Sequence, residues 1–254
     1  MIPDDDRGLL LGDGLFETLL AVDGALQAWA AHIARMRRGC GVLGLEPPEE
    51  AAALAAAEAA LDRAGLNTGR AAVRLTLTAG SGRGLDRPAG AAARLLASAS
   101  PAAGPAEPLR LATVAVRRNA ASPVSRLKTL SYLDNVLARR EARALGADEA
   151  LMLNTSGEVA CCAAANLFWI ASGRLCTPAL DCGVLDGTVR AEVLAEAVGM
   201  GVEVYELQAG PEALGDAEAM FVTNSLMGVV PVATLDGRAL GGDALIGALS
   251  RSRR

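Results

Sequence analysis

Residues 128–138 read Lys128-Thr129-Leu130-Ser131-Tyr132-Leu133-Asp134-Asn135-Val136-Leu137-Ala138. Lys128 is the only lysine of the 254-residue chain, in which lysine and arginine together total 24. Arginine can replace lysine as a surface charge, but a guanidinium group is not deprotonated in proteins and cannot form a Schiff base. The single lysine is therefore either a surface residue left by chance or a reactive amine. It lies just before a predicted helix, residues 132–145.

The composition around this stretch is that of a globular protein, with 52% hydrophobic and 21% charged residues. The net charge of −5 and the pI of about 5.1 argue against a nucleic-acid partner, which usually requires a basic surface. No apolar run reaches the roughly 18–20 residues of a membrane span. The acidic N-terminus, Asp4-Asp5-Asp6, is unlike a signal peptide. We therefore expect a cytoplasmic protein without a membrane partner.

Cysteine and histidine usage excludes several kinds of site. The five cysteines are odd in number and contain no C-x-x-C pair, so the sequence predicts neither a disulfide framework nor a zinc site. His32 is the only histidine, which excludes a metal site built from several imidazoles. A Ser-His-Asp triad would have to use His32, and no G-x-S-x-G motif accompanies it. We expect no metal.

The chain divides at a proline-rich stretch. Residues 100–108 contain three prolines and are the predicted linker between an N-terminal domain, 1–99, and a C-terminal domain, 109–254, that carries Lys128. In the first part, Asp23-Gly24 predicts a hairpin turn, and periodicity predicts helices over 30–43 and 49–64 and a strand over 72–78. The second part alternates short apolar strands with helices. Both domains are thus predicted to mix α and β.

Several motifs accompany the lysine in a fixed order. Upstream of it lie Gly12-Asp13-Gly14-Leu15-Phe16-Glu17-Thr18, His32-Ile33-Ala34-Arg35-Met36 and Gly80-Ser81-Gly82-Arg83-Gly84. Downstream lie Asp148-Glu149-Ala150-Leu151, Ala165-Asn166-Leu167-Phe168-Trp169, Gly183-Val184-Leu185-Asp186-Gly187-Thr188-Val189-Arg190 and Phe221-Val222-Thr223-Asn224-Ser225-Leu226-Met227.

In order and spacing these motifs resemble the fold-type IV pyridoxal-phosphate (PLP) enzymes, over residues 6–238. That family contains branched-chain and D-amino acid aminotransferases and aminodeoxychorismate lyases. Three local sequences are most similar to those of the lyases: residues 80–84, Cys162 before residues 165–169, and residues 223–227. The resemblance implies the two-domain α/β (α+β) fold of the D-amino acid aminotransferase type, PLP as cofactor and a homodimer.

The resemblance also assigns site residues. It makes Lys128 the catalytic residue, which would hold PLP as a Schiff base. It implies cofactor contacts from Arg35, Tyr132, Cys161, Leu185, Thr188, Val189, Ser225 and Leu226. Residues 187–189 open a predicted helix, whose backbone N–H groups suit a phosphate. Phe16 and Thr18 are the expected substrate contacts, whereas the apolar helix face around His32 favours a structural role.

One position departs from the family pattern. Relatives place a glutamate five residues before the asparagine of the Asn-Leu-Phe segment, where it keeps the cofactor's ring nitrogen protonated. Here that position is Cys161. A thiol with a pKa near about 8.5 is a weaker partner for the ring nitrogen than a carboxylate, so we expect the ring to withdraw electrons less strongly.

The resemblance leaves three hypotheses for function. The first is a PLP-dependent lyase that converts 4-amino-4-deoxychorismate to 4-aminobenzoate and pyruvate, a step of folate biosynthesis. The second is a D-amino acid or branched-chain aminotransferase of the same fold. The third is a cofactor-binding protein with reduced or lost catalysis, which Cys161 would explain. Formation of the aromatic product drives the first reaction, so Cys161 favours the lyase.

Overall fold

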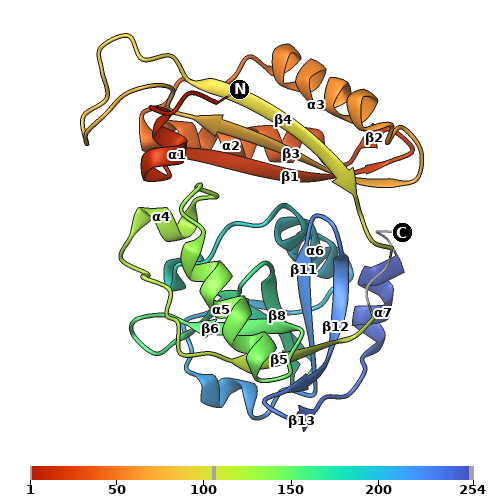
Figure 1. Cartoon of the computed structure of the whole chain (residues 1–254). Coiled ribbons are helices and arrows are strands. Elements are labelled where there is room, and N and C mark those ends of the chain that lie inside the picture. The colour runs from red at the N-terminus through yellow and green to blue at the C-terminus, as the bar shows by residue number, and fades with distance from the viewer. Residues whose placement is uncertain (1, 105–106, 252–254) are drawn as a thin grey trace. The chain divides into compact units, whose positions relative to one another are not determined.

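The computed structural model describes residues 2–104 and 107–251, in which the chain forms two compact units. The first unit comprises Met1–Gly104 and Leu127–Ser131, and the second comprises Pro105–Arg126 and Tyr132–Arg254. Both units combine a sheet with helices, as predicted (Figure 1).

A four-stranded antiparallel sheet forms the centre of the first unit, with the strand order β2-β1-β3-β4. Its strands are β1 (Gly14–Val22), β2 (Ala25–Leu26), β3 (Arg70–Thr78) and β4 (Arg94–Pro101). Leu19 of β1 lies opposite Val73 of β3, and the alternating residues on this face are buried. The two-residue period of a strand therefore separates an apolar face of the sheet from a face of mixed character.

Two helices cover the apolar face, α2 (Trp29–Leu43) and α3 (Glu50–Ala64) (Figure 1). Small residues of α3, Ala53 and Ala57, are fully buried, which lets the helix approach the sheet closely. Both helices end at a glycine with positive φ, Gly44 at 62° and Gly65 at 65°, the usual C-terminal cap. The predicted helices 30–43 and 49–64 are thus confirmed.

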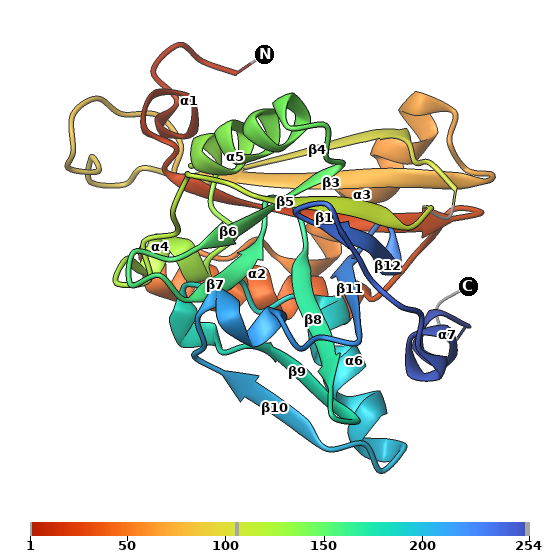
Figure 2. The same cartoon turned by 90° about the horizontal axis from the view of Figure 1, so that it is seen from below.

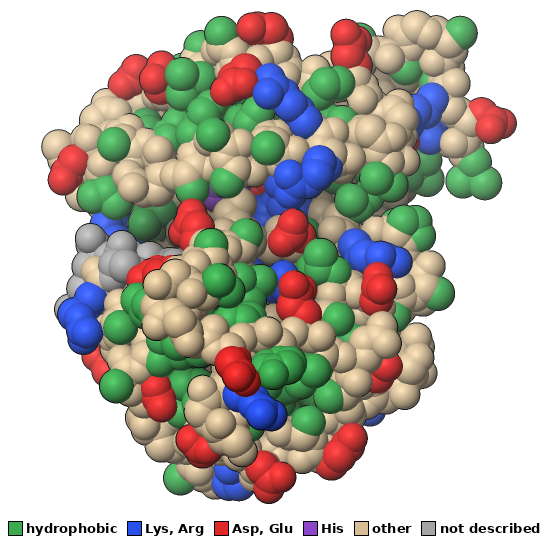
Figure 3. Space-filling model, turned by 180° about the vertical axis from the view of Figure 1, so that it is seen from behind, with side chains coloured by type: hydrophobic (Ala, Val, Ile, Leu, Met, Phe, Trp, Pro, Cys, Tyr) green, Lys and Arg blue, Asp and Glu red, His purple; other side chains and the backbone are tan. Residues whose placement is uncertain are grey.

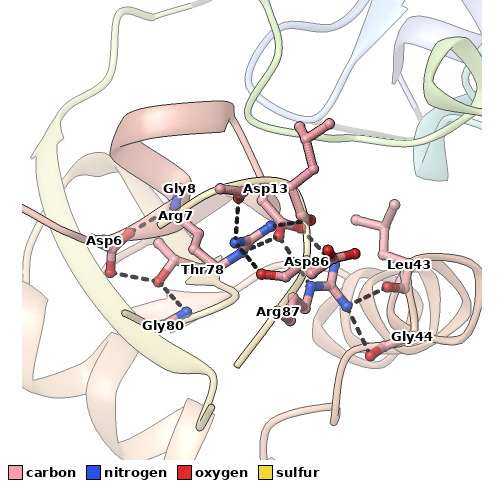
Figure 4. Close-up of polar contacts among 12 residues, drawn as sticks. Asp6, Arg7, Gly8, Asp13, Leu43, Gly44, Thr78, Gly80, Asp86 and Arg87 are labelled. Atoms are coloured by element: carbon pink, nitrogen blue, oxygen red, sulfur yellow. Dashed lines mark hydrogen bonds and ion pairs between the residues drawn. The ribbon is translucent and has the colours of Figure 1, made fainter. Parts of the chain in front are cut away.

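A short helix, α1 (Arg7–Leu11), precedes β1. Asp6 caps it by accepting a hydrogen bond from the Gly8 amide, and it also accepts one from the Thr78 hydroxyl (Figure 4). This cap joins the N-terminal segment to the end of β3.

Two arginines and one aspartate hold the long connection between β3 and β4 (Figure 4). Arg7, only 2% exposed, donates hydrogen bonds to three successive carbonyl groups of the connection, those of Gly84, Leu85 and Asp86. Asp13 pairs with Arg7 at 2.8 Å and with Arg87 at 2.5 Å. We call this set, Arg7, Asp13 and Arg87, the loop clamp.

The loop clamp also reaches the end of a helix. Arg87 donates hydrogen bonds to the carbonyl oxygens of Leu43 and Gly44, which lie where α2 ends. Cations are favoured at helix C-termini, where carbonyl groups lack partners within the helix. The hydrogen bonds from Arg87, and then those from Arg7, hold the pKa of Asp13 below its ordinary value although burial opposes them.

The second unit is built on a longer mixed sheet, whose strand order is β10-β9-β8-β11-β12-β5-β6-β7 (Figure 2). Its main strands are β5 (Leu109–Thr113), β6 (Glu149–Leu153), β7 (Val159–Cys162), β8 (Asn166–Ala171), β9 (Arg174–Pro178), β10 (Val204–Leu207), β11 (Ala219–Asn224) and β12 (Gly228–Leu235); β13 (Arg238–Ala239) pairs with β12.

The helices of the second unit are α4 (Pro123–Arg126), α5 (Leu133–Ala144), α6 (Thr188–Gly199) and α7 (Ala244–Arg251), with two 3-10 turns, η1 (Leu180–Cys182) and η2 (Pro211–Leu214). One core cluster contains the fully buried Trp169 and Leu151. A second places Val189 and Val193 of α6 against Phe168 and Phe221, whose rings stack at 4.8 Å. The core thus fixes where α6 begins.

The segment that contains Lys128 belongs to the first unit, not to the second. Leu15 of β1 forms an antiparallel bridge with Thr129, the Phe16 amide donates to the Lys128 carbonyl at 2.9 Å, and the Leu130 amide donates to the Gly14 carbonyl at 3.0 Å. The structure therefore corrects the predicted division, which placed Lys128 in the C-terminal domain, because long-range backbone pairing outweighs position in the chain. The predicted linker 100–108 begins inside β4, and its residues 105–106 lie outside the described part.

Among the described residues, no helix combines the length and the apolar character that a membrane span requires.

We predict that Asp13→Asn will lower the free energy of unfolding by about 1.5–3 kcal/mol at pH 7, the range for hydrogen bonds to charged groups. Because the pKa of Asp13 is lower in the folded state, its stabilising contribution is present at neutral pH and is lost as the pH falls below roughly 4. Urea unfolding of both proteins from pH 7 to pH 3 measures this.

Hydrogen exchange locates the effect, since amides of residues 84–87 should exchange faster in the variant. Asp216→Asn, at an exposed aspartate of the second unit, is the matched control and should change neither measurement. Equal stability of Asp13→Asn and the parent at pH 7 would show that the loop clamp does not stabilise the fold.

Candidate active site

Lys128 lies beside the edge of β1 that β3 does not occupy. Its backbone pairs with β1, and its ammonium nitrogen lies 4.3 Å from the centroid of the Phe16 ring. Burial lowers the pKa of Lys128 to about 8; the nearby charges of Arg35 and Arg74 act in the same direction and Glu17 opposes them. An appreciable part of this amine is therefore neutral, and so nucleophilic, near physiological pH.

A buried cluster of three charged or polar side chains accompanies the amine. Glu17 of β1 is 1% exposed and accepts hydrogen bonds from Arg35 through Nε at 2.8 Å and Nη2 at 2.5 Å. The Nδ1 atom of His32 donates to the same carboxylate at 2.7 Å. Burial would raise the pKa of Glu17, but the hydrogen bonds and charge of its partners hold that pKa below its ordinary value.

The face of the sheet opposite α2 and α3 carries the predicted substrate contacts. Thr18 lies directly opposite Arg74 in the register of β1 and β3, so both project from the face that carries Phe16. The Arg74 guanidinium carbon lies 3.7 Å from the Phe16 ring centroid, a cation–π contact. Phe16 is thus in contact with two cations, Arg74 and Lys128.

In the second unit, two predicted phosphate contacts meet at the start of α6. The hydroxyl oxygens of Thr188 and Ser225 are 3.3 Å apart. Gly187 is the N-cap residue of α6, and no side chain caps the helix there. A Cβ at Gly187 would lie 2.1 Å from the Asn166 carboxamide oxygen, so only glycine fits. This helix N-terminus therefore combines backbone N–H groups with two hydroxyls.

Side-chain amides fix the backbone on either side of this helix start. Asn166 donates to the Leu185 carbonyl at 2.9 Å. Asn224 accepts hydrogen bonds from the amides of Leu226 and Met227, which forms the turn that carries Ser225. The Leu226 amide donates within this turn, and the Val189 side chain packs in the core while its backbone lies in the first turn of α6.

Cys161 lies on β7, opposite Met152 of β6, and is 6% exposed. Burial raises the pKa of its thiol, Arg118 opposes this, and Glu149 adds to it. The thiol is therefore neutral at pH 7. Tyr132, half-buried, is the N-cap residue of α5 and follows the Lys128 segment directly in the chain.

The structure adds residues that the sequence reasoning passed over. Of residues 16–18, only Phe16 and Thr18 were expected at the site, yet Glu17 is the acceptor that binds Arg35. His32 is buried, as a structural role requires, and it donates a hydrogen bond to the Glu17 carboxylate. Arg74 was not singled out. The alternation of 72–78 was the available signal, since it places Arg74 on one face and Val73 on the other.

The chain is similar to known proteins over nearly its whole length. The sequence profile of the family "Amino-transferase class IV" matches residues 14–235. The aminodeoxychorismate lyase of Bacillus subtilis is 31% identical over 91% of this chain and 80% of its own. A Methanocaldococcus jannaschii protein assigned as a branched-chain-amino-acid aminotransferase is 33% identical over 92% of this chain and 83% of its own.

Among solved structures, 4-amino-4-deoxychorismate lyase from Pseudomonas aeruginosa superposes with a TM-score of 0.88 at 34% identity, covering 99% of this chain and 94% of that one. The predicted fold and cofactor class are thereby confirmed. The chain belongs to the class IV aminotransferase family, whose members are fold-type IV, PLP-dependent enzymes.

Proposed function

We propose that this protein is a PLP-dependent lyase that converts 4-amino-4-deoxychorismate to 4-aminobenzoate and pyruvate. The observation that carries the proposal is the neutral, buried thiol of Cys161 at the position of the family's glutamate. A thiol holds a protonated ring nitrogen less well than a carboxylate. A reaction that ends in an aromatic product depends less on an electron-withdrawing ring than transamination does.

The residues present fit PLP. The cofactor needs an amine for its aldehyde and donors for its phosphate. Lys128 provides an amine with a pKa of about 8. The start of α6, which no side chain caps, offers backbone N–H groups together with the Thr188 and Ser225 hydroxyls, a donor set suited to a phosphate. Arg35 is proposed to add a guanidinium, and Tyr132 a phenol.

Bound PLP supplies an aldehyde that condenses with amines and a ring that withdraws electrons from the amine-bearing carbon. In our proposal Lys128 would hold the cofactor through its amine. With the substrate bound, the same amine would remove the proton from the amine-bearing carbon of the substrate. The bond between the ring carbon and the enolpyruvyl oxygen breaks, and the proton returns to the departing three-carbon unit, which leaves as pyruvate.

The sheet face beside Lys128 is proposed to receive the substrate. Phe16 offers an aromatic surface, and Thr18 lies opposite Arg74, whose positive charge suits a carboxylate. 4-Amino-4-deoxychorismate carries two carboxylates, and the Arg74 cation suits one of them.

A second candidate function is an aminotransferase acting on branched-chain or D-amino acids. The similarity to the M. jannaschii protein favours it as strongly as the similarity to the B. subtilis protein favours the lyase. A cofactor-binding protein with reduced or lost catalysis is the third, and the experiments below separate all three.

We also propose a homodimer in the cytoplasm, acting in folate biosynthesis. Apolar side chains of the first unit are exposed, among them Leu9 at 67% and Leu85 at 87%. Leu85 lies in the connection between β3 and β4 that the loop clamp holds. Figure 3 shows hydrophobic side chains among charged ones on one face of the molecule. Exposed apolar groups on a rigid loop are typical of a protein interface.

We predict that borohydride reduction will fix the cofactor on the single peptide that contains Lys128, because no other side chain of the sequence can form the Schiff base. Lys128→Ala should lose the visible absorption of the bound cofactor. Arg126→Ala, which removes a neighbouring exposed cation, is the matched control and should keep it. Unchanged absorption in Lys128→Ala would refute the assignment.

We predict that the protein will release pyruvate from 4-amino-4-deoxychorismate much faster than it transaminates any common amino acid. Lactate dehydrogenase coupling measures pyruvate, and fluorescence measures 4-aminobenzoate. Single-turnover spectra with D-alanine and with leucine measure the competing reaction. Rapid conversion by either amino acid without pyruvate would support the aminotransferase, and no turnover in a cofactor-loaded protein would support lost catalysis.

We predict that Cys161→Glu will speed the transamination half-reaction at least about tenfold, since a carboxylate raises the pKa of the ring nitrogen and one pKa unit corresponds to a tenfold effect. Cys161→Ser is the matched, uncharged control and should give no gain. Cofactor loading is checked first by absorbance, because glutamate is larger than cysteine. No gain in a folded, loaded variant would mean that another group pairs with the ring nitrogen.

A further inference from the structure

Glu17 is a buried carboxylate that the proposed reaction does not use. It is 1% exposed, and strand alternation directs it to the face opposite Phe16. Burying a charge is costly unless it is paired and hydrogen-bonded. The buried charge of Glu17 is therefore stabilised by its two partners on α2, His32 and Arg35.

The contact with Arg35 has a specific geometry. Glu17 binds the guanidinium through Nε and Nη2, which are two donors on one edge, and such a bidentate pair fixes the plane of the group. His32 lies three residues before Arg35 on the same face of α2 and donates to the same carboxylate. The orientation of Arg35 is thus set by β1 and not by α2 alone.

The same carboxylate lies beside the segment that carries the amine, because Glu17 directly follows Phe16, whose amide donates to the Lys128 carbonyl at 2.9 Å. The charged groups that influence Lys128 come from three elements: Glu17 from β1, Arg35 from α2 and Arg74 from β3. His32 of α2 is the further titratable group, in contact with Glu17. Two of these groups are cations that disfavour the ammonium form of Lys128, and Glu17 is the anion that opposes them.

We propose that Glu17 is a positioning residue of the Lys128 site, which fixes Arg35 by one edge of its guanidinium and supplies a negative charge that balances the cations around the Lys128 amine. The proposal rests on the proposed function only in taking Lys128 as the reacting amine. A purely structural role, in which Glu17 merely joins β1 to α2, is the alternative.

The single lysine makes a direct test possible. The full chain, produced with [13Cε]lysine and stripped of cofactor, gives one lysine resonance whose pH titration reports the pKa of Lys128. Glu17→Gln should lower that pKa by roughly half a unit to one unit, because it removes the opposing anion. Arg35→Gln should raise it, and Glu17→Asp, which keeps the charge, should restore most of the parent value.

Glu149→Gln is the matched control. Glu149 is also fully buried and pairs with Arg139 at 3.6 Å, but it lies in the second unit and is not among the charges that shift Lys128. Its substitution should leave the lysine titration unmoved. A folded Glu17→Gln protein with the parent titration would overturn the proposal and leave Glu17 a structural residue.

Glu17→Gln leaves the buried Arg35 without its counter-charge, so the variant can fail to fold. In that case Glu17→Gln combined with Arg35→Met is compared with Arg35→Met alone, because the double variant keeps neither charge of the pair. A lower pKa of Lys128 in the double variant supports the proposal, and equal values overturn it. The lysine titration does not depend on turnover. An unchanged titration would therefore overturn the role of Glu17 and leave the borohydride assignment of Lys128 intact. A failed borohydride assignment would overturn the proposed function without changing the titration result.

Discussion

The backbone pairing between β1 and the segment around Lys128 is the constraint on which the rest of the site depends. A reactive amine needs both a fixed position and a nearly dry environment, and a long flexible side chain on the surface has neither. Hydrogen bonds from the Phe16 amide to the Lys128 carbonyl and from the Leu130 amide to the Gly14 carbonyl fix the backbone from Lys128 to Leu130. The strand that receives this segment also carries Phe16 and Glu17, so one element provides the aromatic surface on one face and the counter-charge on the other.

Two carboxylates of the first unit, Glu17 and Asp13, each bind two basic partners. Glu17 binds Arg35 and His32, and Asp13 binds Arg7 and Arg87. In both sets the pKa of the carboxyl group lies below its ordinary value, so the charges persist at neutral pH. The two sets differ in what they hold. The loop clamp fixes an exposed connection, whereas the Glu17 cluster fixes side chains beside the amine.

Local patterns were sufficient to predict much of the fold and to single out Lys128. Periodicity located α2, α3 and β3, because their buried residues recur at helical or strand spacing, and the composition alone drew attention to Lys128. The partners of Glu17 could not be predicted, since no spacing along the chain relates residue 17 of a strand to residues 32 and 35 of a helix. The division into domains was misplaced for the same reason. A linker is visible as a run of prolines, but a five-residue segment that returns to the first unit has no compositional signal.

The pairing of residues 127–131 with the first unit affects how the protein folds during synthesis. Ribosomes synthesise the whole antiparallel sheet of the first unit, β1 to β4, well before residues 127–131 emerge. Until then the start of β1 presents unpaired amide and carbonyl groups along the edge that β3 does not cover, the kind of edge that invites pairing with another chain. The nascent N-terminal unit is therefore at risk of aggregation, and the arrival of residues 127–131 both brings Lys128 to β1 and closes that edge.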